Sequence, residues 1–168
     1  MGGVGTYSVI LPQLLTEAGH EVVVVTKRFP QSPEYEEFGS VPVHRLPFYW
    51  EYPHDRTPND DELFYNEMHH VRSFIGGFAR SFAQEFPQLQ ERYEFDIVLT
   101  QEVEAPAFLA QDRRMLLGEF DHIPFVVFVH SPHFDIQDYN HDGQYLRADY
   151  HRVLYENHSM ALADGLIF

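Results

Sequence analysis

The first residues of the chain are glycines whose types and spacing suit contact with phosphate. Gly2, Gly3 and Gly5 form a short glycine loop that leads into an amphipathic segment. Glycines lack a Cβ atom, so a diphosphate can approach their backbone closely while the amides of the following helix N-terminus face its charge. Gly2 and Gly3 are therefore the candidate diphosphate-binding residues. The alternative is a tight turn that binds no ligand, because glycine is common at helix starts.

Polar side chains follow two segments that are expected to be buried strands. His130 comes directly after the apolar run 125–129, and Gln101 and Glu102 follow the run 95–100. Open α/β sheets bind their ligands beyond the carboxyl ends of the strands. Imidazole, amide and carboxylate groups there can all form hydrogen bonds with the hydroxyls of a ligand. The alternative for His130 is a histidine that only satisfies the local backbone.

Histidine and aspartate gather in residues 130–142, a segment that the sequence predicts to be a loop. The members of this group are His130, His133, Asp135, Asp138, His141 and Asp142. Such side chains can imitate a zinc or manganese site, which would suit a metal-dependent hydrolase. A loop gives them no helical spacing that would make them converge, so we predict no metal site. Glu104, after Glu102, is predicted to favour the start of the next helix.

Helices and strands alternate along the rest of the chain. The expected order is helix 7–18, strand 21–26, strand 41–46, helix 60–90, strand 95–100, helix 105–118, strand 124–129, helix 143–163 and strand 164–168. Gly19 is expected to end the first helix, Pro42 to keep its strand at a sheet edge, and Pro87 to mark the frayed end of the long helix. Four consecutive valines predict that the strand at 21–26 is buried on both faces. The alternation indicates a doubly wound, Rossmann-like parallel sheet in an α/β fold.

Composition narrows the class of protein further. The 168 residues suffice for one well-buried core, so residues 1–168 are expected to form a single domain. The formal net charge of −15 would repel a polyphosphate, which argues against a nucleic-acid partner. The absence of cysteine excludes disulfides, thiolate metal sites and cysteine nucleophiles. No apolar run approaches the ~20 residues of a membrane helix, and we expect a cytoplasmic protein.

Three segments together resemble the N-terminal domain of the family 4 retaining glycosyltransferases, which have the GT-B fold. They are GGVGTYSVILPQLLTEAGHEVVVVT at 2–26, FDIVLTQEVEAPAFLA at 95–110, and IPFVVFVHSPHFD from 123 with the closing ALADGLIF. The combination is more specific than the glycine loop, which occurs in many folds. It includes a histidine directly after a buried strand and an Ala-Asp-Gly before the last strand.

The resemblance implies a sugar transferase with retention of configuration. It implies a nucleotide-sugar donor, a sugar or small hydroxyl compound as acceptor, and no cofactor. His130 would be the catalytic residue that contacts the donor sugar or the reacting centre, Gly2 and Gly3 would bind the donor diphosphate, and Gln101 and Glu102 would bind the acceptor. The family's donor-binding C-terminal domain and its paired glutamates have no counterpart here, so the isolated chain is expected to be inactive. A stand-alone binding or scaffold module with the same fold is the main alternative.

The resemblance also implies a first strand before the glycine loop, so the domain is expected to be truncated at both ends. That strand normally lies at the centre of the sheet, between the strands at 22–26 and 97–100. Its absence would leave two apolar edges unpaired. We therefore expect either that these two strands pair directly or that a second copy of the chain fills the place, giving a strand-swapped homodimer.

Overall fold

A computed structural model describes residues 3–29, 31–47, 75–140 and 147–168 of the chain. These residues belong to two compact units, one within residues 1–48 and one within residues 49–168. The predicted α/β class with parallel strands is confirmed in both. The prediction that all 168 residues make one domain stays a prediction. The long helix expected from residue 60 falls outside the described residues up to residue 74.

The first unit is a helix followed by a three-stranded sheet. Helix α1 (Gly3–Glu17) precedes β1 (Val24–Lys27), β2 (Tyr35–Phe38) and β3 (Val41–Leu46), and the strand order is β1-β3-β2. β1 runs parallel to β3, and β2 runs antiparallel to it. Gly19 lies two residues after the end of α1 and has a φ of 92°, the left-handed conformation that is typical of a helix end, as the sequence predicted. The prediction that β1 is buried on both faces was wrong, because all four of its residues are half-buried.

The expected edge position of β3 was also wrong, since β3 lies in the middle of its sheet. The N–H of Arg45 donates to the carbonyl of Glu34 (2.8 Å). The backbone N–H and C=O groups of the odd-numbered residues of β3 therefore point toward β2, and those of the even-numbered residues point toward β1. The nitrogen of Pro42 therefore faces the β1 side. Pairing with β1 begins only at Val24 and Val43, one residue later. The missing N–H thus falls where no partner strand needs it, which is how a central strand tolerates this proline.

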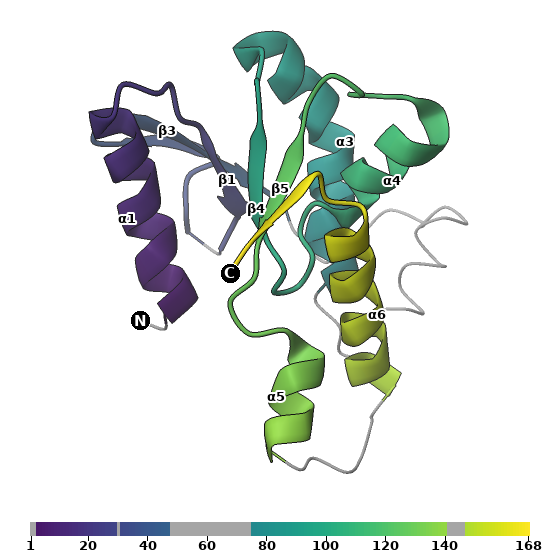
Figure 1. Cartoon of the computed structure of the whole chain (residues 1–168). Helices are drawn as coiled ribbons and strands as arrows, with labels where there is room; N and C mark the ends of the chain where they lie inside the picture. Colours follow the sequence, from purple (N-terminus) through teal and green to yellow (C-terminus); the bar gives the residue numbers. More distant parts are fainter. Residues whose placement is uncertain (1–2, 30, 48–74, 141–146) are drawn as a thin grey trace. The chain divides into compact units, whose positions relative to one another are not determined.

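The second unit is a parallel sheet with helices beside it. Its strands are β4 (Val98–Gln101), β5 (Phe125–Phe128) and β6 (Gly165–Ile167), in the order β4-β5-β6. Figure 1 shows α3 (Ile75–Tyr93), α4 (Phe108–Leu117) and α6 (Arg147–Ala161) together beside these strands. Helix α5 (His133–Asn140) lies beyond the end of β5. The strand predicted at the end of the chain is confirmed as β6.

Aromatic rings form the core between α3 and the sheet of the second unit. Phe86 of α3 is 1% exposed, and its ring centroid lies 5.8 Å from that of Phe125 in β5 and 4.8 Å from that of Phe120. The side chains of Phe125 and Val127 are fully buried, so β5 turns one face toward the helices. Burial of rings this large dominates the energetics of a small core. The core therefore fixes the position of β5, and with it the end of the strand where His130 lies.

Three helix boundaries differ from the sequence predictions, and one helix was not predicted. α1 already includes Gly3, so the glycine-rich segment from that residue onward is the first turn of a helix. α3 continues through Pro87 to Tyr93, and Pro87 does not mark its end. α4 starts at Phe108, four residues after Glu104, so Glu104 does not lie in the first turn of that helix. Residues 133–140, expected as loop, form α5.

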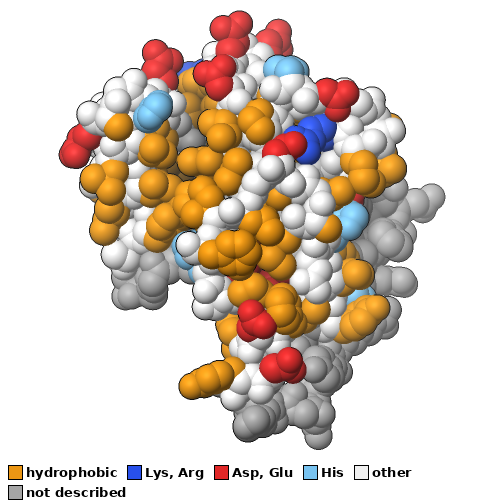
Figure 2. Space-filling view, viewed as in Figure 1, with side chains coloured by type: hydrophobic (Ala, Val, Ile, Leu, Met, Phe, Trp, Pro, Cys, Tyr) orange, Lys and Arg blue, Asp and Glu red, His pale blue; other side chains and the backbone are white. Residues whose placement is uncertain are grey.

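The surface reflects the acidic composition. Figure 2 shows several acidic and few basic side chains on the face that it draws. In the second unit the exposed apolar side chains include Leu99, Leu166 and Ile167. Among the described residues, no helix is both long enough and apolar enough to cross a bilayer.

Candidate functional site

His130 lies just past the carboxyl end of β5, where the sequence placed it. Its residue is exposed, and its imidazole stacks against the ring of Phe128 with centroids 6.4 Å apart and planes at 14°. Phe128 is the last residue of β5, so the stacking ties the imidazole to the end of the strand. Aromatic stacking of this kind restricts ring orientation. The imidazole is thus oriented by its neighbour, in a residue that is exposed to solvent.

Glu102 contacts the backbone of this histidine from the neighbouring strand. Its carboxylate is 0% exposed, and Oε1 accepts hydrogen bonds from the N–H groups of His130 (2.7 Å) and Ser131 (2.5 Å). The other oxygen, Oε2, is buried and has no hydrogen-bond partner among the described residues. A buried polar atom without a partner is costly, and such atoms gather at sites that serve a ligand or a reaction. Gln101, the residue before it, is half-buried at the end of β4.

Glu156 of α6 joins the same region from a third element. Glu156 is 1% exposed. Its Oε2 accepts a hydrogen bond from the N–H of His133 (2.8 Å), and its Oε1 accepts one from the N–H of Glu104 (3.3 Å). Burial raises the pKa of Glu156 above its ordinary value, although the hydrogen bonds from His133 and Glu104 act in the opposite direction. Glu156 therefore connects the turn after β4 to the start of α5. We call Glu102, Glu156 and the turns that they hold, 102–105 and 130–133, the carboxyl-end cluster.

The turn after β4 is strained. Glu104 and Ala105 have φ angles of 61° and 41°, in the left-handed region that non-glycine residues rarely adopt. Ala105 is fully buried, and its N–H donates to the carbonyl of Glu102 (2.8 Å). Strained backbone of this kind persists only where its surroundings hold it, and it concentrates at functional sites. The bond from the N–H of Glu104 to Glu156 is one of the contacts that hold it here.

The opposite end of the sheet carries a second polar group, built on Arg114 of α4. Its guanidinium donates to the carbonyls of Ile123 (3.0 Å) and Leu162 (3.2 Å) and to the carboxylate of Asp164. Asp164 also accepts from the N–H of Phe125 (2.7 Å). The guanidinium carbon lies 5.3 Å from the ring centroid of Phe125. We call Arg114 and Asp164 the amino-end cluster, because they hold the starts of β5 and β6.

The charge of Asp164 is favoured in this position. Burial raises the pKa of Asp164, but the hydrogen bonds from Arg114 and from the N–H of Phe125 outweigh it and hold the pKa below its ordinary value. Asp164 is the acidic residue of the Ala-Asp-Gly segment that supports the family resemblance. Its contacts give that segment a structural role at the start of β6.

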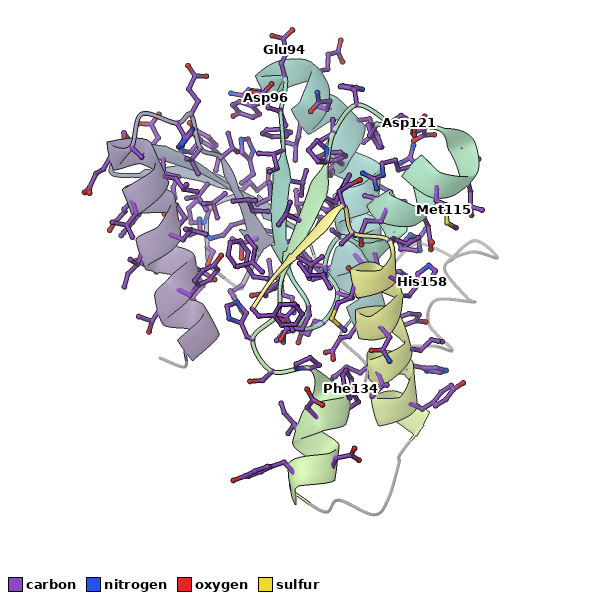
Figure 3. The ribbon with its side chains drawn as sticks, in the orientation of Figure 1. Glu94, Asp96, Met115, Asp121, Phe134 and His158 are labelled. Carbon is purple, nitrogen blue, oxygen red and sulfur yellow. The ribbon has the colours of Figure 1, made fainter. Side chains whose placement is uncertain are left out.

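Two polar pairs connect α4 and α6. The side chain of His158, labelled on α6 in Figure 3, lies with Nε2 at 2.6 Å from Oδ1 of Asp112 on α4. Deeper between the same helices, Ser159 Oγ donates to Gln111 Oε1 (2.7 Å), and Gln111 Nε2 donates to the carbonyl of Ser159 (3.0 Å). Buried polar groups that satisfy each other in this way fix the register of two helices. These contacts position α6, the helix that carries Glu156.

The glycine and metal predictions both involve residues outside the described part of the chain. Gly2 lies outside the described residues, and Gly3 begins α1, so its role in phosphate binding stays a prediction. That Gly3 and His130 serve one site also stays a prediction. Among the described residues, no three His, Asp or Glu side chains are grouped so that they could hold a metal ion. His141 and Asp142 of the predicted histidine and aspartate loop lie outside the described residues.

The sequence interpretation missed Glu156. This residue lies 52 positions from Glu104 and 23 from His133, and no local motif marks it. A signal for α5 was present: Ser131 and Pro132 precede the helix, and Asp135 lies in its first turn. Serine before the first turn, proline at its start and an acidic residue within it are typical of a helix N-terminus.

Comparison with known protein families defines the class of this protein. The model of the glycosyl transferase 4-like domain matches residues 2–167, nearly the whole chain. The chain therefore belongs to this glycosyltransferase family, as the sequence resemblance indicated. Its α/β architecture, with parallel strands and helices, is that of a Rossmann-like half of a GT-B fold. A search of curated proteins found no match.

Proposed function

We propose that this chain is the acceptor-binding half of a retaining glycosyltransferase that moves a sugar from a nucleotide donor to a hydroxyl group. The observation that carries this proposal is the position of His130, exposed at the carboxyl end of β5 in a chain that belongs to a glycosyltransferase family. An accessible imidazole at this edge can donate to a hydroxyl of the donor sugar. The bonds from the His130 and Ser131 amides to Glu102 add support, because they hold the histidine in one place.

The remaining site residues follow from the same proposal. Gly2 and Gly3 bind the donor diphosphate through backbone amides at the start of α1. Gln101 and Glu102 serve the acceptor side: Gln101 is half-buried at the end of β4, and the buried carboxylate of Glu102 holds the neighbouring turn. The leaving phosphate takes the acceptor's proton, so the protein's contribution is to position the reactants and stabilise charge. The partners are a nucleotide sugar, a hydroxyl acceptor and a C-terminal donor-binding domain.

The test is sugar transfer by the protein expressed from its complete gene. UDP-, GDP- and ADP-sugars are offered in turn, and NMR of the product's anomeric proton reports whether the configuration is retained. We expect one donor class to support transfer and the 168-residue chain alone to show none. Failure of the complete gene product to transfer sugar from any of these donors would contradict the proposal and favour a stand-alone binding module.

The assignment of His130 has its own test in the active protein. Replacing one hydrogen-bond donor at a reacting centre costs about 100-fold or more in rate, so His130→Ala is expected to lower kcat/KM by about that factor. His122→Ala is the matched control, because His122 is another exposed histidine of the same unit, in the turn before β5. Equal activity of the two variants would contradict the role given to His130.

A further inference from the structure

Glu102 is placed to act on His130 without touching the substrate. We propose that Glu102 is a positioning residue, whose carboxylate fixes the backbone at His130 and so sets where the imidazole points. This inference rests on the proposed function for its kinetic consequence. Its structural part rests on two hydrogen bonds from consecutive backbone amides to one buried oxygen. It differs from a direct role in binding the acceptor, which the sequence had indicated for the same residue.

The backbone of Glu102 is fixed before its side chain acts. Its N–H donates to the carbonyl of Phe128 (3.1 Å), which extends the ladder between β4 and β5 by one residue. The carboxylate then reaches the amides of His130 and Ser131, two residues beyond that ladder. The chain leaving β5 is therefore held twice, by the ladder at Phe128 and by the carboxylate at His130. With the ring of His130 stacked on Phe128, little freedom is left to the imidazole.

The charge of the carboxylate is what makes this contact strong. Hydrogen bonds from N–H groups to an ionised carboxylate are about twice as strong as those between neutral groups. The carboxylate is fully buried, so water does not compete for Oε1. A glutamine at this position keeps the shape and one acceptor oxygen but loses the charge. The two amides are then held more weakly, while the core around Phe86 and Phe125 is left as it is.

Kinetics separate positioning from direct acceptor binding. A residue that acts through His130 lowers kcat when it is replaced, because the imidazole is misplaced in the transition state. A residue that binds the acceptor directly raises the KM for the acceptor. We expect Glu102→Gln to lower kcat by about 10- to 100-fold, in line with the effect of a small misplacement at a reacting centre, with the acceptor KM unchanged. Glu91→Gln, at an exposed position of α3, is the matched control with unchanged kinetics.

A double-mutant cycle with His130→Ala completes the test. If Glu102 acts through the imidazole, Glu102→Gln has almost no further effect on kcat once the imidazole is gone. The proposal would be overturned if the two single effects on kcat multiply in the double variant. It would also be overturned if Glu102→Gln raises the acceptor KM and leaves kcat unchanged. Both results would show that Glu102 acts on the substrate independently of His130.

Amide measurements keep this inference separate from the proposed function. In the unaltered protein, hydrogen exchange at the His130 and Ser131 amides is expected to be slow, although both residues are exposed, and Glu102→Gln is expected to speed it at least tenfold. If the protein transfers no sugar, the proposed function fails while this exchange still decides whether Glu102 holds the turn. Rapid exchange at both amides in the unaltered protein would overturn the proposal, whatever the activity.

Discussion

The two ends of the parallel sheet in the second unit use charge in opposite ways. In the amino-end cluster the cation Arg114 donates to backbone carbonyls and to Asp164. In the carboxyl-end cluster two buried carboxylates, Glu102 and Glu156, accept from backbone amides. Each end thus captures loop backbone with side chains, but with groups of opposite sign.

The ends also differ in how completely their polar groups are paired. The guanidinium of Arg114 lies over the ring of Phe125 and has three hydrogen-bond acceptors, a set of contacts that serves stability. The carboxyl end keeps Oε2 of Glu102 buried without a partner among the described residues, next to a turn with two left-handed φ angles. Unpaired atoms and strain cost stability and concentrate where a protein acts on a ligand. The amino end therefore serves stability, whereas the carboxyl end, where we propose the functional site, gives up some of it.

The largest expected effect on stability lies at the amino end. Arg114→Ala removes three hydrogen bonds, and the carbonyl of buried Ile123, just before β5, loses the guanidinium donor. The free energy of unfolding should therefore fall by about 2–4 kcal/mol. Urea unfolding followed by circular dichroism measures it. Arg114→Lys is the control: it keeps the charge but lacks the planar fork, and is expected to recover less than half of the loss. A loss under about 0.5 kcal/mol for Arg114→Ala would contradict the stabilising role of this end.

Acid is expected to affect the two ends in opposite directions. The pKa of Glu156 is raised by burial, so the native state binds its proton at higher pH than the unfolded state does. Its contribution to the free energy of unfolding therefore rises as pH falls through the native pKa. The pKa of Asp164 is lowered, so its contribution is present above the unfolded pKa and is lost as pH falls through the native one.

Two variants measure this contrast between about pH 7 and about pH 2, well below the ordinary aspartate pKa of 3.8. Glu156→Gln leaves one partly buried N–H without an acceptor, which costs about 1 kcal/mol near neutrality, and its deficit relative to the unaltered protein should widen in acid. Asp164→Asn should cost about 1 kcal/mol or less, since its side chain is 42% exposed, and its deficit should narrow. Urea unfolding across the pH range follows both. Deficits that change in the same direction would remove this difference between the ends.

Local signals in the sequence predicted the strands of the second unit and the carboxyl ends of α1 and α4, but not the contacts that build the site. The apolar run before His130 and the closing Gly165–Ile167 segment identified β5 and β6, and Gly118 ends α4 with a φ of 69°. The hairpin from β2 to β3 was missed, although Gly39-Ser40 between its strands is a known two-residue turn signal. The prolines and glutamates of residues 29–40 are typical of a loop, and this composition obscures the turn signal.

The candidate site was predicted in part for the same reason. His130 and Glu102 both follow strands, so strand prediction alone placed them at one sheet edge. The hydrogen bonds between them, and the participation of Glu156, depend on how segments distant in sequence pack together. The sequence offers no rule that selects one buried glutamate of α6 as the partner of two turns.

The smallest expected effect concerns Pro87, the residue that was expected to end α3. A proline has no N–H, so the carbonyl of Ala83, four residues earlier, lacks its helical donor. The guanidinium of Arg113 on α4 donates to that carbonyl. Arg113 thus does at a helix–helix contact what Arg114, its neighbour, does at the amino end of the sheet: it supplies a donor to a backbone oxygen. The proline is tolerated inside the helix because a residue of another helix replaces the missing bond.

A double-mutant cycle tests this replacement. Pro87→Ala restores the N–H, so Arg113→Ala should cost less stability in that background than in the unaltered chain, with an interaction of about 0.5–1 kcal/mol. Thermal and urea unfolding of the four proteins measure the interaction. Gln84→Ala, at an exposed position of α3, takes the place of Pro87→Ala in a control cycle and should show additive effects. Additive effects in the first cycle as well would contradict this replacement. They would mean that Arg113 stabilises the protein through its other contacts, such as the ion pair with Glu119, and that its hydrogen bond to the carbonyl of Ala83 does not contribute.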